Sequence, residues 1–242
     1  MIQTINSKDN ARVKYAYSLK MGKFRHLHHQ FLIEGKKNVE MALKANKVEE
    51  IFSLKPLDNV SKSVKQYLVN QQIVEKLTSN KNPDGIIAIC HFLDYEIKED
   101  FHKVVYLDHL SDPGNIGTII RTSLALGYDA VILSENSCDL YNEKVIAASK
   151  GSIFFIPVFE GNLKDLLPNH QVVVTHLSDK TIDVENAKKA LKKDFVIVFG
   201  NESKGASQDI IKEADLMVKI PIEKIDSLNV SVAAGIVLYL FR

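Results

Sequence analysis

Cysteine is scarce in this sequence of 242 residues, and its scarcity excludes two kinds of small stabilised fold. Cys90 and Cys138 lie far apart and have no CxxC or Cys/His spacing around them. A disulfide framework and a zinc ribbon are therefore excluded. Each thiol is better explained as a small core residue than as a reactive group.

Long apolar segments are also absent. The longest, residues 230–241, is shorter than the ~20 residues that a membrane-spanning helix needs. Residues 1–14 carry charges where a secretion signal has an apolar core, which predicts a cytoplasmic protein. Hydrophobic residues make up 45% and charged residues 25% of the chain, a balance typical of globular proteins. This length predicts one large or two ordinary domains.

Two common nucleotide-binding motifs are missing as well. The chain contains neither the GxxxxGK[ST] order of a phosphate-binding loop nor the GxGxxG fingerprint of a dinucleotide site. It also has no internal repeat and no low-complexity tract, so repeat architectures are excluded.

Charge is nearly balanced over the whole chain but not along it. The net charge is +1, yet residues 1–50 hold ten Lys or Arg and only five acids. A basic stretch on a near-neutral body indicates a surface that faces a polyanion. A solvated helix face is the open alternative, and the adjacent His26, His28 and His29 indicate phosphate contact or plain surface rather than a metal site. The candidate residues for binding a polyanion are Lys8, Arg12, Lys14, Lys23 and Arg25.

Helix and strand patterns alternate in two series. The first has expected strands at 31–33, 48–54 and 85–93, and expected helices at 11–19, 39–45 and 60–69. The acidic segment 94–100 is the expected linker. The second series has expected strands at 103–108, 130–133, 153–158, 171–176, 195–199 and 216–220, with helices at 116–126, 141–149, 162–167, 207–214 and 230–241. Such alternation predicts a mostly parallel, three-layer α/β sheet. In that class the ligand lies at the carboxyl ends of the strands.

The first polar loop at such a strand end spans residues 108–121 and opens a helix. It contains Asn115, Gly117 and Arg121. Backbone N–H groups at a helix start can receive an anion or a ribose. An ordinary strand–helix loop with a Pro-Gly turn explains the same residues.

Two further loops follow the expected strands 195–199 and 216–220. One places Glu202 between Gly200 and Gly205, either to present backbone groups to a planar ligand or because a tight turn needs glycine. The other contains Ser227 and Asn229, either of which can cap the final helix.

Together, in this order and spacing, the three loops closely resemble the motifs of the SpoU/TrmH family of RNA ribose 2′-O-methyltransferases, within the SPOUT superfamily. The matching residues are Asn115, Ile116, Gly117, Arg121 and Gly127, then Gly200, Asn201, Glu202 and Gly205, then Ile220, Pro221 and residues 227–231. Segments 31–35 and 83–88 resemble the substrate-binding domain that precedes the catalytic domain in many members.

The resemblance implies two α/β domains. Residues 1–95 would form a small αβ sandwich that binds RNA, and residues 96–242 a three-layer methyltransferase domain with a trefoil knot at about 197–242. The implied cofactor is S-adenosylmethionine, and no metal is implied. By carry-over, its expected contacts are Thr175, His176, Leu177, Phe199, Gly200, Asn201, Gly205, Ile220, Ile222, Ser227, Leu228 and Val230.

Methyl transfer to a ribose mainly requires alignment of the hydroxyl with the methyl group. The resemblance implies catalytic roles for Arg121, Asn115, Glu202, Ser227 and Asn229. Arg121 matches the family's catalytic arginine; because a guanidinium has a pKa above ~12, anchoring a hydroxyl or phosphate is easier for it than abstracting a proton. Both roles stay open. Glu202 would orient Arg121 or a neighbour, and the other three would position ligand and loops.

The expected activity is 2′-O-methylation of structured RNA. The additional N-terminal domain favours ribosomal over transfer RNA. An RNA-binding factor that kept the fold without the chemistry is the alternative, and a dinucleotide-dependent enzyme is suggested only by the α/β pattern. A homodimer is implied, with residues 117–126 and 230–241 as the expected interface, although packing within one subunit explains the same apolar pattern.

Overall fold

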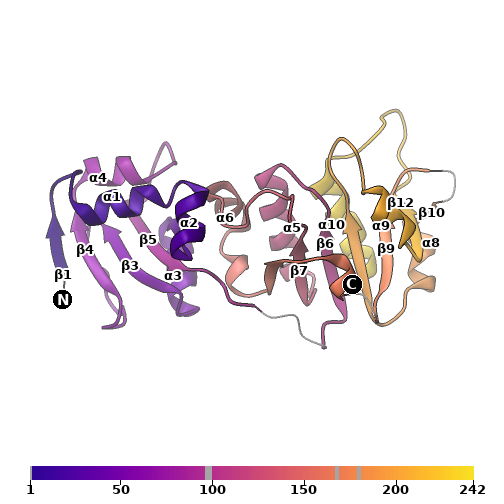
Figure 1. The fold of residues 1–242 in the computed structure, drawn as a ribbon, viewed down its shortest axis with the longest axis horizontal. Coiled ribbons are helices and arrows are strands. Elements are labelled where there is room, and N and C mark those ends of the chain that lie inside the picture. The colour runs from indigo at the N-terminus through magenta and orange to yellow at the C-terminus, as the bar shows by residue number, and fades with distance from the viewer. Residues whose placement is uncertain (1, 96–99, 167–168, 179–180) are drawn as a thin grey trace. The chain divides into compact units, whose positions relative to one another are not determined.

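The computed structural model describes residues 2–95, 100–166, 169–178 and 181–242. Its internal contacts define two compact units (Figure 1), which we describe separately. Unit 1 comprises Met1–Asp94 and Tyr141–Phe154, and unit 2 comprises Tyr95–Leu140 and Phe155–Arg242. Residues 141–154, expected within the methyltransferase domain, therefore pack with unit 1. Residues 96–99 of the expected linker lie outside the described part of the chain.

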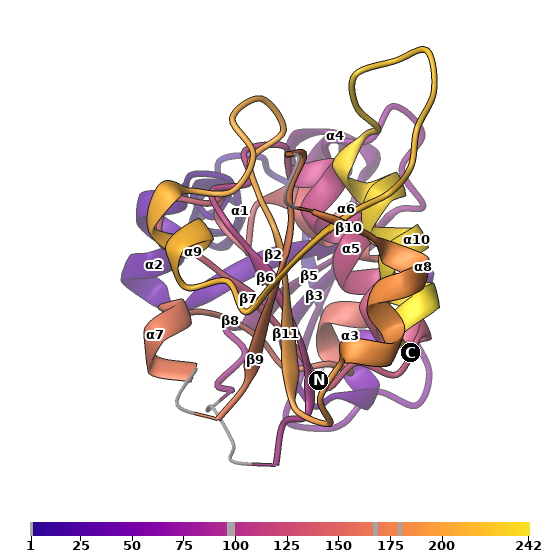
Figure 2. The ribbon, with the colours of Figure 1, turned by 90° about the vertical axis from the view of Figure 1, so that its right-hand side faces the viewer.

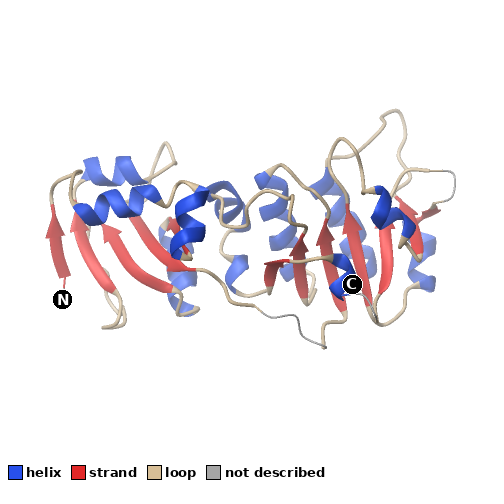
Figure 3. Cartoon of the chain, viewed as in Figure 1, coloured by secondary structure: helices blue, strands red, loops and turns tan. Residues whose placement is uncertain are grey.

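Unit 1 is built on a five-stranded mixed sheet, drawn red in Figure 3. Its strand order is β1 (Ile2–Ile5), β4 (Lys65–Val69), β3 (Val48–Ser53), β5 (Ile86–His91) and β2 (Gln30–Glu34). The first three strands are parallel, whereas β5 runs antiparallel to both β3 and β2. The near-continuous apolar run predicted as a covered strand is β5, in which five of six residues are buried.

The N-terminal segment supplies four helices of unit 1. They are α1 (Ala11–Ser18), α2 (Gly22–His28), α3 (Lys36–Lys44) and α4 (Gln71–Leu77). Asn10 caps α1, because its side chain accepts a hydrogen bond from the backbone N–H of Arg12. Apolar residues of α1 and α4, including Val13 and Ile73, pack on Phe52 and Ile87 of the sheet.

The expected helix at 60–69 is wrong. Residues 65–69 form β4, which pairs in parallel with β1 on one side and β3 on the other. Two ladders of backbone hydrogen bonds outweigh the weak local preference that indicated a helix. The helix begins instead at α4, where the Asn70 side chain accepts from the backbone N–H of Ile73.

Unit 2 contains a seven-stranded sheet in which every pair is parallel. The strand order is β10 (Ile182–Asp183), β12 (Leu216–Lys219), β9 (Gln171–Thr175), β11 (Phe195–Phe199), β6 (Lys103–Leu107), β7 (Ala130–Leu133) and β8 (Val158–Glu160). All five residues of β11 are buried, as expected for a central parallel strand.

Helices cover both faces of this sheet, so the predicted three-layer α/β class is confirmed. Figure 2 shows α5 (Pro113–Ala125), α8 (Val184–Ala187) and α10 (Val230–Phe241) on one face, with α7 (Leu163–Leu166) and α9 (Gln208–Lys212) on the other. The trefoil knot implied for residues 197–242 stays a prediction.

The expected strand at 153–158 is also wrong. Residues Ser152–Phe154 form a 3-10 turn in unit 1, after helix α6 (Glu143–Ser149), and β8 starts only at Val158. Pro157 has no N–H to donate to a ladder, so the strand begins after it.

Among the described residues, no helix combines the length and apolar character needed to cross a bilayer.

Candidate functional site

The polar loops predicted from the sequence meet at one edge of the unit 2 sheet. β12, β9, β11 and β6 are consecutive neighbours and run parallel, so their carboxyl ends share that edge. The loops that leave these strands begin at residues 220, 176, 200 and 108. The expected cofactor and catalytic segments are thus brought together by strand order alone.

Three side chains, one from each predicted motif, form a continuous hydrogen-bonded chain. The Asn229 Nδ2 atom donates to Asn115 Oδ1 at 3.1 Å. Asn115 Nδ2 in turn donates to Glu202 Oε1 at 3.1 Å. Asn115 is 9% exposed, so losing either partner leaves a polar group in a poorly hydrated place. We call this set the Asn229–Asn115–Glu202 chain.

Helix capping sets the direction of both asparagines. Asp112 accepts from the backbone N–H of Asn115 at 2.8 Å and begins α5, with Pro113 in its first turn. Asn229 caps α10 by accepting from the N–H groups of Ser231 and Val232. Asn229 therefore both caps a helix and links two motifs, whereas the Ser227 hydroxyl is exposed and has no hydrogen-bond partner among the described residues.

Glu202 also holds the first motif loop through backbone donors. The N–H groups of Ser111 and Asp112 lie 3.5 and 3.3 Å from its two carboxylate oxygens. Next to it, Asn201 Nδ2 donates to the carbonyl of His109 at 2.8 Å. The carboxylate thus organises a loop of this chain, a role that the Asp-Pro-Gly signature of residues 112–114 did not by itself reveal.

Gly200 allows the second motif loop to close on itself. A Cβ atom at this position would lie 2.1 Å from the backbone nitrogen of Ala206. Asn201 and Gly205 form an isolated antiparallel bridge, and Gly205 has φ of +70°, a conformation that favours glycine. The close approach of the backbone therefore requires glycine at 200, and the positive φ favours glycine at 205.

Arg121 lies on α5, two helical turns beyond the cap. It is exposed, and its guanidinium has no hydrogen bond or ion pair with any described residue. Neither Glu202 nor Asn115 contacts it, so the expected orientation of Arg121 by Glu202 is not seen within this chain. All five guanidinium donors stay available to a substrate.

The expected cofactor contacts fit a ligand held mainly by backbone groups. Within the described chain, no backbone N–H between residues 221 and 228 donates a hydrogen bond to protein. The edge also exposes apolar surface, with Leu177 at 57% and Ile225 at 58%. Free peptide groups beside apolar side chains suit an adenosine, whose base is apolar on its faces and polar at its edges.

A hollow of about 290 Å³ lies beside these loops on the side of α9. Its lining includes Tyr106, Asp108, His109 and Ile210. Asp108 is buried and accepts from the backbone N–H of Ser207 at 2.7 Å, which fixes the start of α9. Burial, with a smaller contribution from Asp108, raises the pKa of Tyr106 to about 12. Its hydroxyl therefore stays protonated and donates to the carbonyl of Gly161 at 3.3 Å.

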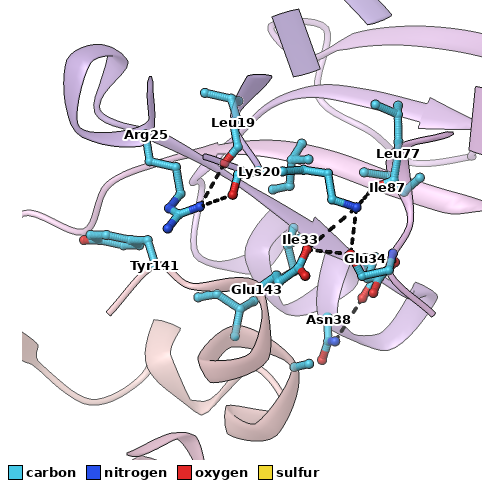
Figure 4. A pocket seen from close by; sticks show the side chains of 14 residues that line it. Leu19, Lys20, Arg25, Ile33, Glu34, Asn38, Leu77, Ile87, Tyr141 and Glu143 are labelled. Atoms are coloured by element: carbon cyan, nitrogen blue, oxygen red, sulfur yellow. Dashed lines mark hydrogen bonds and ion pairs between the residues drawn. The ribbon is translucent and has the colours of Figure 1, made fainter. Parts of the chain in front are cut away.

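The candidate RNA-binding residues of unit 1 divide into engaged and free cations. Arg25 is only 6% exposed, and Figure 4 shows its guanidinium turned toward the carbonyl oxygens of Leu19 and Lys20, at 3.1 and 2.8 Å. This placement supports the turn between α1 and α2 rather than phosphate contact. Arg12 is paired with the buried Glu50 at 2.7 Å.

The three lysines of the set remain on the surface. Lys8 and Lys23 are exposed, and Lys14 is exposed in a loose ion pair with Asp9 at 3.5 Å. His26, His28 and His29 are exposed too. Within the described chain, no group of three or more His, Cys, Asp or Glu side chains is arranged to hold a metal ion.

Two family models match different parts of the chain. Residues 102–239 match the SpoU rRNA Methylase family, and residues 10–88 match the MRM3-like substrate binding domain. The chain is 30% identical to the 23S rRNA (guanosine(2553)-2′-O)-methyltransferase RlmP of Bacillus subtilis, and the match covers 100% of each chain.

Solved structures show the same fold. The AdoMet-bound rRNA methyltransferase from Sinorhizobium meliloti superimposes with a TM-score of 0.90 and 29% identity, over 100% of this chain and 97% of that one. A structure described as an RNA 2′-O ribose methyltransferase gives a TM-score of 0.80 and 27% identity, over 98% and 97% of the two chains.

The parallel sheet, the shared loop edge and the linked motifs define a SPOUT-type RNA methyltransferase that uses S-adenosylmethionine. The chain belongs to the SpoU rRNA methylase family. The family and cofactor predicted from the three motifs are thereby confirmed.

Proposed function

We propose that the protein transfers a methyl group from S-adenosylmethionine to a ribose 2′-hydroxyl of ribosomal RNA. The Asn229–Asn115–Glu202 chain carries the proposal, because it joins the three family motifs into one constellation at the ligand edge of the sheet. The names of the Bacillus subtilis and Sinorhizobium meliloti relatives support ribosomal RNA over transfer RNA.

When bound, the cofactor supplies an electrophilic methyl group. We assign its binding to the loops at Thr175–Leu177, Phe199–Gly205 and residues 220–230, the last of which offers free backbone N–H groups at 222–228. Asn115 and Asn229 hold two of these loops in register with α5. The chain's main contribution to rate is then alignment of the hydroxyl, which avoids much of the entropic cost of bringing two reactants together.

Arg121 and Ser227 face the substrate in this proposal. Both are exposed, and neither has a protein partner among the described residues. Arg121 would hold the ribose hydroxyl or an adjacent phosphate through its planar donors. Ser227 would add one hydroxyl to the same site.

Residues 1–95 would hold the RNA, with Lys8, Lys14 and Lys23 as phosphate contacts. The match of residues 10–88 to a substrate-binding domain supports this role. Arg12 and Arg25 would contribute by shaping the surface instead, because their guanidinium groups are already engaged.

We also propose a homodimer whose interface includes α10. Val232, Ile236 and Tyr239 recur at helical spacing along this helix and are 53%, 37% and 54% exposed. Exposed large apolar side chains in one stripe are typical of an interface. The cytoplasmic location stays a prediction.

Mapping of ribose methylation on total RNA, with and without the protein, tests the function. We expect one or a few ribosomal positions to lose their 2′-O-methyl group when the protein is absent. Loss confined to transfer RNA would contradict the ribosomal assignment, and no loss at all would favour the non-catalytic RNA-binding alternative.

A further inference from the structure

The surface of α1 and α2 in unit 1 carries a row of three rings with a cation at each end. In spatial order they are Arg12, Tyr15, His28, Phe24 and Lys23, and we call them the α1–α2 row. The Arg12 guanidinium carbon lies 4.6 Å from the centre of the Tyr15 ring. At the other end, Lys23 Nζ lies 4.8 Å from the centre of the Phe24 ring.

The rings between these two cations contact one another. The centres of Tyr15 and His28 are 5.0 Å apart, with their planes tilted by 59°. His28 and Phe24 are nearly parallel, at 8°, with centres 6.4 Å apart. Because His28 and Lys23 are exposed and Tyr15 and Phe24 are only half-buried, ring surface is open to solvent.

Hydrogen bonds to the sheet hold one end of the row in place. Arg12 Nε donates to Glu50 at 3.1 Å, in addition to the ion pair described above. The Tyr15 hydroxyl donates to the Gln30 side chain, which in turn donates to Glu49. A platform that is already ordered loses little conformational entropy when a ligand binds.

Charge around the row favours a polyanion. Glu50 balances the charge of Arg12 and is itself 0% exposed, so it presents no negative charge to solvent. Lys8, Lys14 and Lys23 remain as exposed cations on the same segment, opposed there only by Asp9. A phosphate backbone meets these requirements.

The exposed rings distinguish between the two forms of RNA. In a duplex the base faces are stacked on one another, and proteins reach mainly the backbone and the 2′-hydroxyls. An unpaired base can leave its stack and lie on an aromatic side chain, with arginine or lysine adding a cation–π contribution. The α1–α2 row offers these partners in one line.

We propose that the α1–α2 row stacks an unpaired base of the RNA substrate while Lys8, Lys14 and Lys23 contact the flanking phosphates. This inference rests on the proposed function, because it specifies how unit 1 holds the RNA of that reaction. The substrate region is accordingly a loop or bulge rather than a continuous helix.

Binding of the full chain to two RNAs tests the proposal. One is a hairpin with 2-aminopurine in its unpaired loop, and the other is a fully paired duplex of equal length and charge. The wild-type protein should bind the hairpin more tightly and quench the 2-aminopurine fluorescence through stacking. His28→Ala and Phe24→Ala should weaken hairpin binding by about 5- to 150-fold, the range expected for one base stacked on one ring.

The same variants should leave duplex affinity and the salt dependence of binding unchanged. Leu27→Ala is the matched control, because Leu27 is exposed on the same helix but has no ring. His28→Phe should retain hairpin binding, and the exposed position of His28 guards against a folding defect.

Equal binding of hairpin and duplex by the wild-type protein, or equal losses for both RNAs in His28→Ala, would overturn the stacking role. Preference for an acidic peptide over both RNAs would overturn it too and point to a protein partner. If methyl transfer persists with those results, only the α1–α2 row is refuted, and the proposed function stands.

Discussion

Arg25 of unit 1 and Arg121 of unit 2 show how differently two regions of one protein use the same side chain. Arg25 follows a basic stretch, yet its guanidinium is buried and donates to two backbone carbonyls. Arg121 lies in a mostly apolar helix, yet its guanidinium is exposed and has no partner within the described chain. The charge of the neighbouring residues in the sequence therefore does not predict the role of either arginine. The role follows from whether the guanidinium N–H groups already have hydrogen-bond partners in the protein.

The hydrogen-bond networks of the two units also differ in what they connect. In unit 1, hydrogen bonds of Arg12, Tyr15 and Arg25 are directed inward and fix a surface. In unit 2, Asn115 and Asn229 link loops at a ligand edge and leave Arg121 and Ser227 outside the network. The network of the first region fixes helices on their own sheet, and that of the second joins loops distant in sequence and leaves two polar side chains free of protein partners.

Replacing Arg121 should produce the largest effect. We expect Arg121→Ala to lower methyl transfer by about 100- to 1,000-fold, the loss typical of removing one preorganised donor from a reacting centre. Cofactor affinity should stay within about twofold, because the proposed function assigns the arginine to the substrate and no hydrogen bond joins it to the Asn229–Asn115–Glu202 chain. Transfer of labelled methyl to RNA and calorimetric titration with S-adenosylmethionine measure the two quantities. An active Arg121→Ala variant would refute the assigned role.

Gly200→Ala should have the second largest effect, which we expect on affinity for S-adenosylmethionine. Its Cβ would meet the Ala206 backbone at 2.1 Å, so the loop must open, at a cost of about 1–3 kcal/mol. We expect cofactor affinity to fall at least about tenfold. Gly161→Ala, outside the three motif loops, is the matched control: its Cβ would lie 3.5 Å from the nearest atom, Cγ2 of Ile132, which is ordinary van der Waals contact. Equal cofactor affinity in both variants would contradict this account of the loop.

Arg25→Met should destabilise the protein, whereas Arg121→Met should not. Arg25→Met leaves two carbonyls without a charged donor, and we expect unfolding free energy to drop by about 1.5–3 kcal/mol. Arg121→Met should change it by no more than about 0.5 kcal/mol, as expected for an exposed side chain without contacts. Denaturant titration of both variants measures the difference. Similar stabilities would remove the contrast drawn between the units.

Neutralising the three exposed lysines should have the smallest effect, which we expect on RNA affinity and its salt dependence. For Lys8→Gln, Lys14→Gln and Lys23→Gln, each lost phosphate contact should reduce the slope of log affinity against log salt by roughly 0.7–0.9. Cofactor affinity should not change. If slope and affinity both stay constant, the lysines are a solvated helix face and the phosphate contacts are refuted, while the methyltransferase assignment is unaffected.

The sequence predicts unit 2 better than unit 1. Unit 2 has regular βα alternation, so the motif loops are correctly expected at strand ends, and α10 matches its expected range. Unit 1 pairs strands across intervening helices, and β4 owes its strand form to two partners that its local pattern does not show. Helix α2 was not predicted, because its residues Gly22–His28 show no apolar periodicity.

Side-chain partners were the least predictable feature of the site. Asn115, Glu202 and Asn229 belong to three motifs far apart in the sequence. Nothing in the sequence shows that Asn115 will bond to both of the others. Arg12 and Arg25 look alike in a basic stretch, and only the fold shows that one meets Glu50 and the other the end of α1. The aromatic partners Tyr15, Phe24 and His28 are spaced across two helices whose packing no local pattern specifies.

The Asn229–Asn115–Glu202 chain has a consequence for the protein's synthesis. Asn115 is separated by 87 residues from Glu202 and by 114 from Asn229. Because contacts so distant in sequence form late and slow folding, a growing chain on the ribosome can complete unit 1's sheet long before the loops of unit 2 are joined. Unit 1 can then fold while the three motifs of unit 2 are still apart, and the proposed active site is complete only after the final helix has emerged.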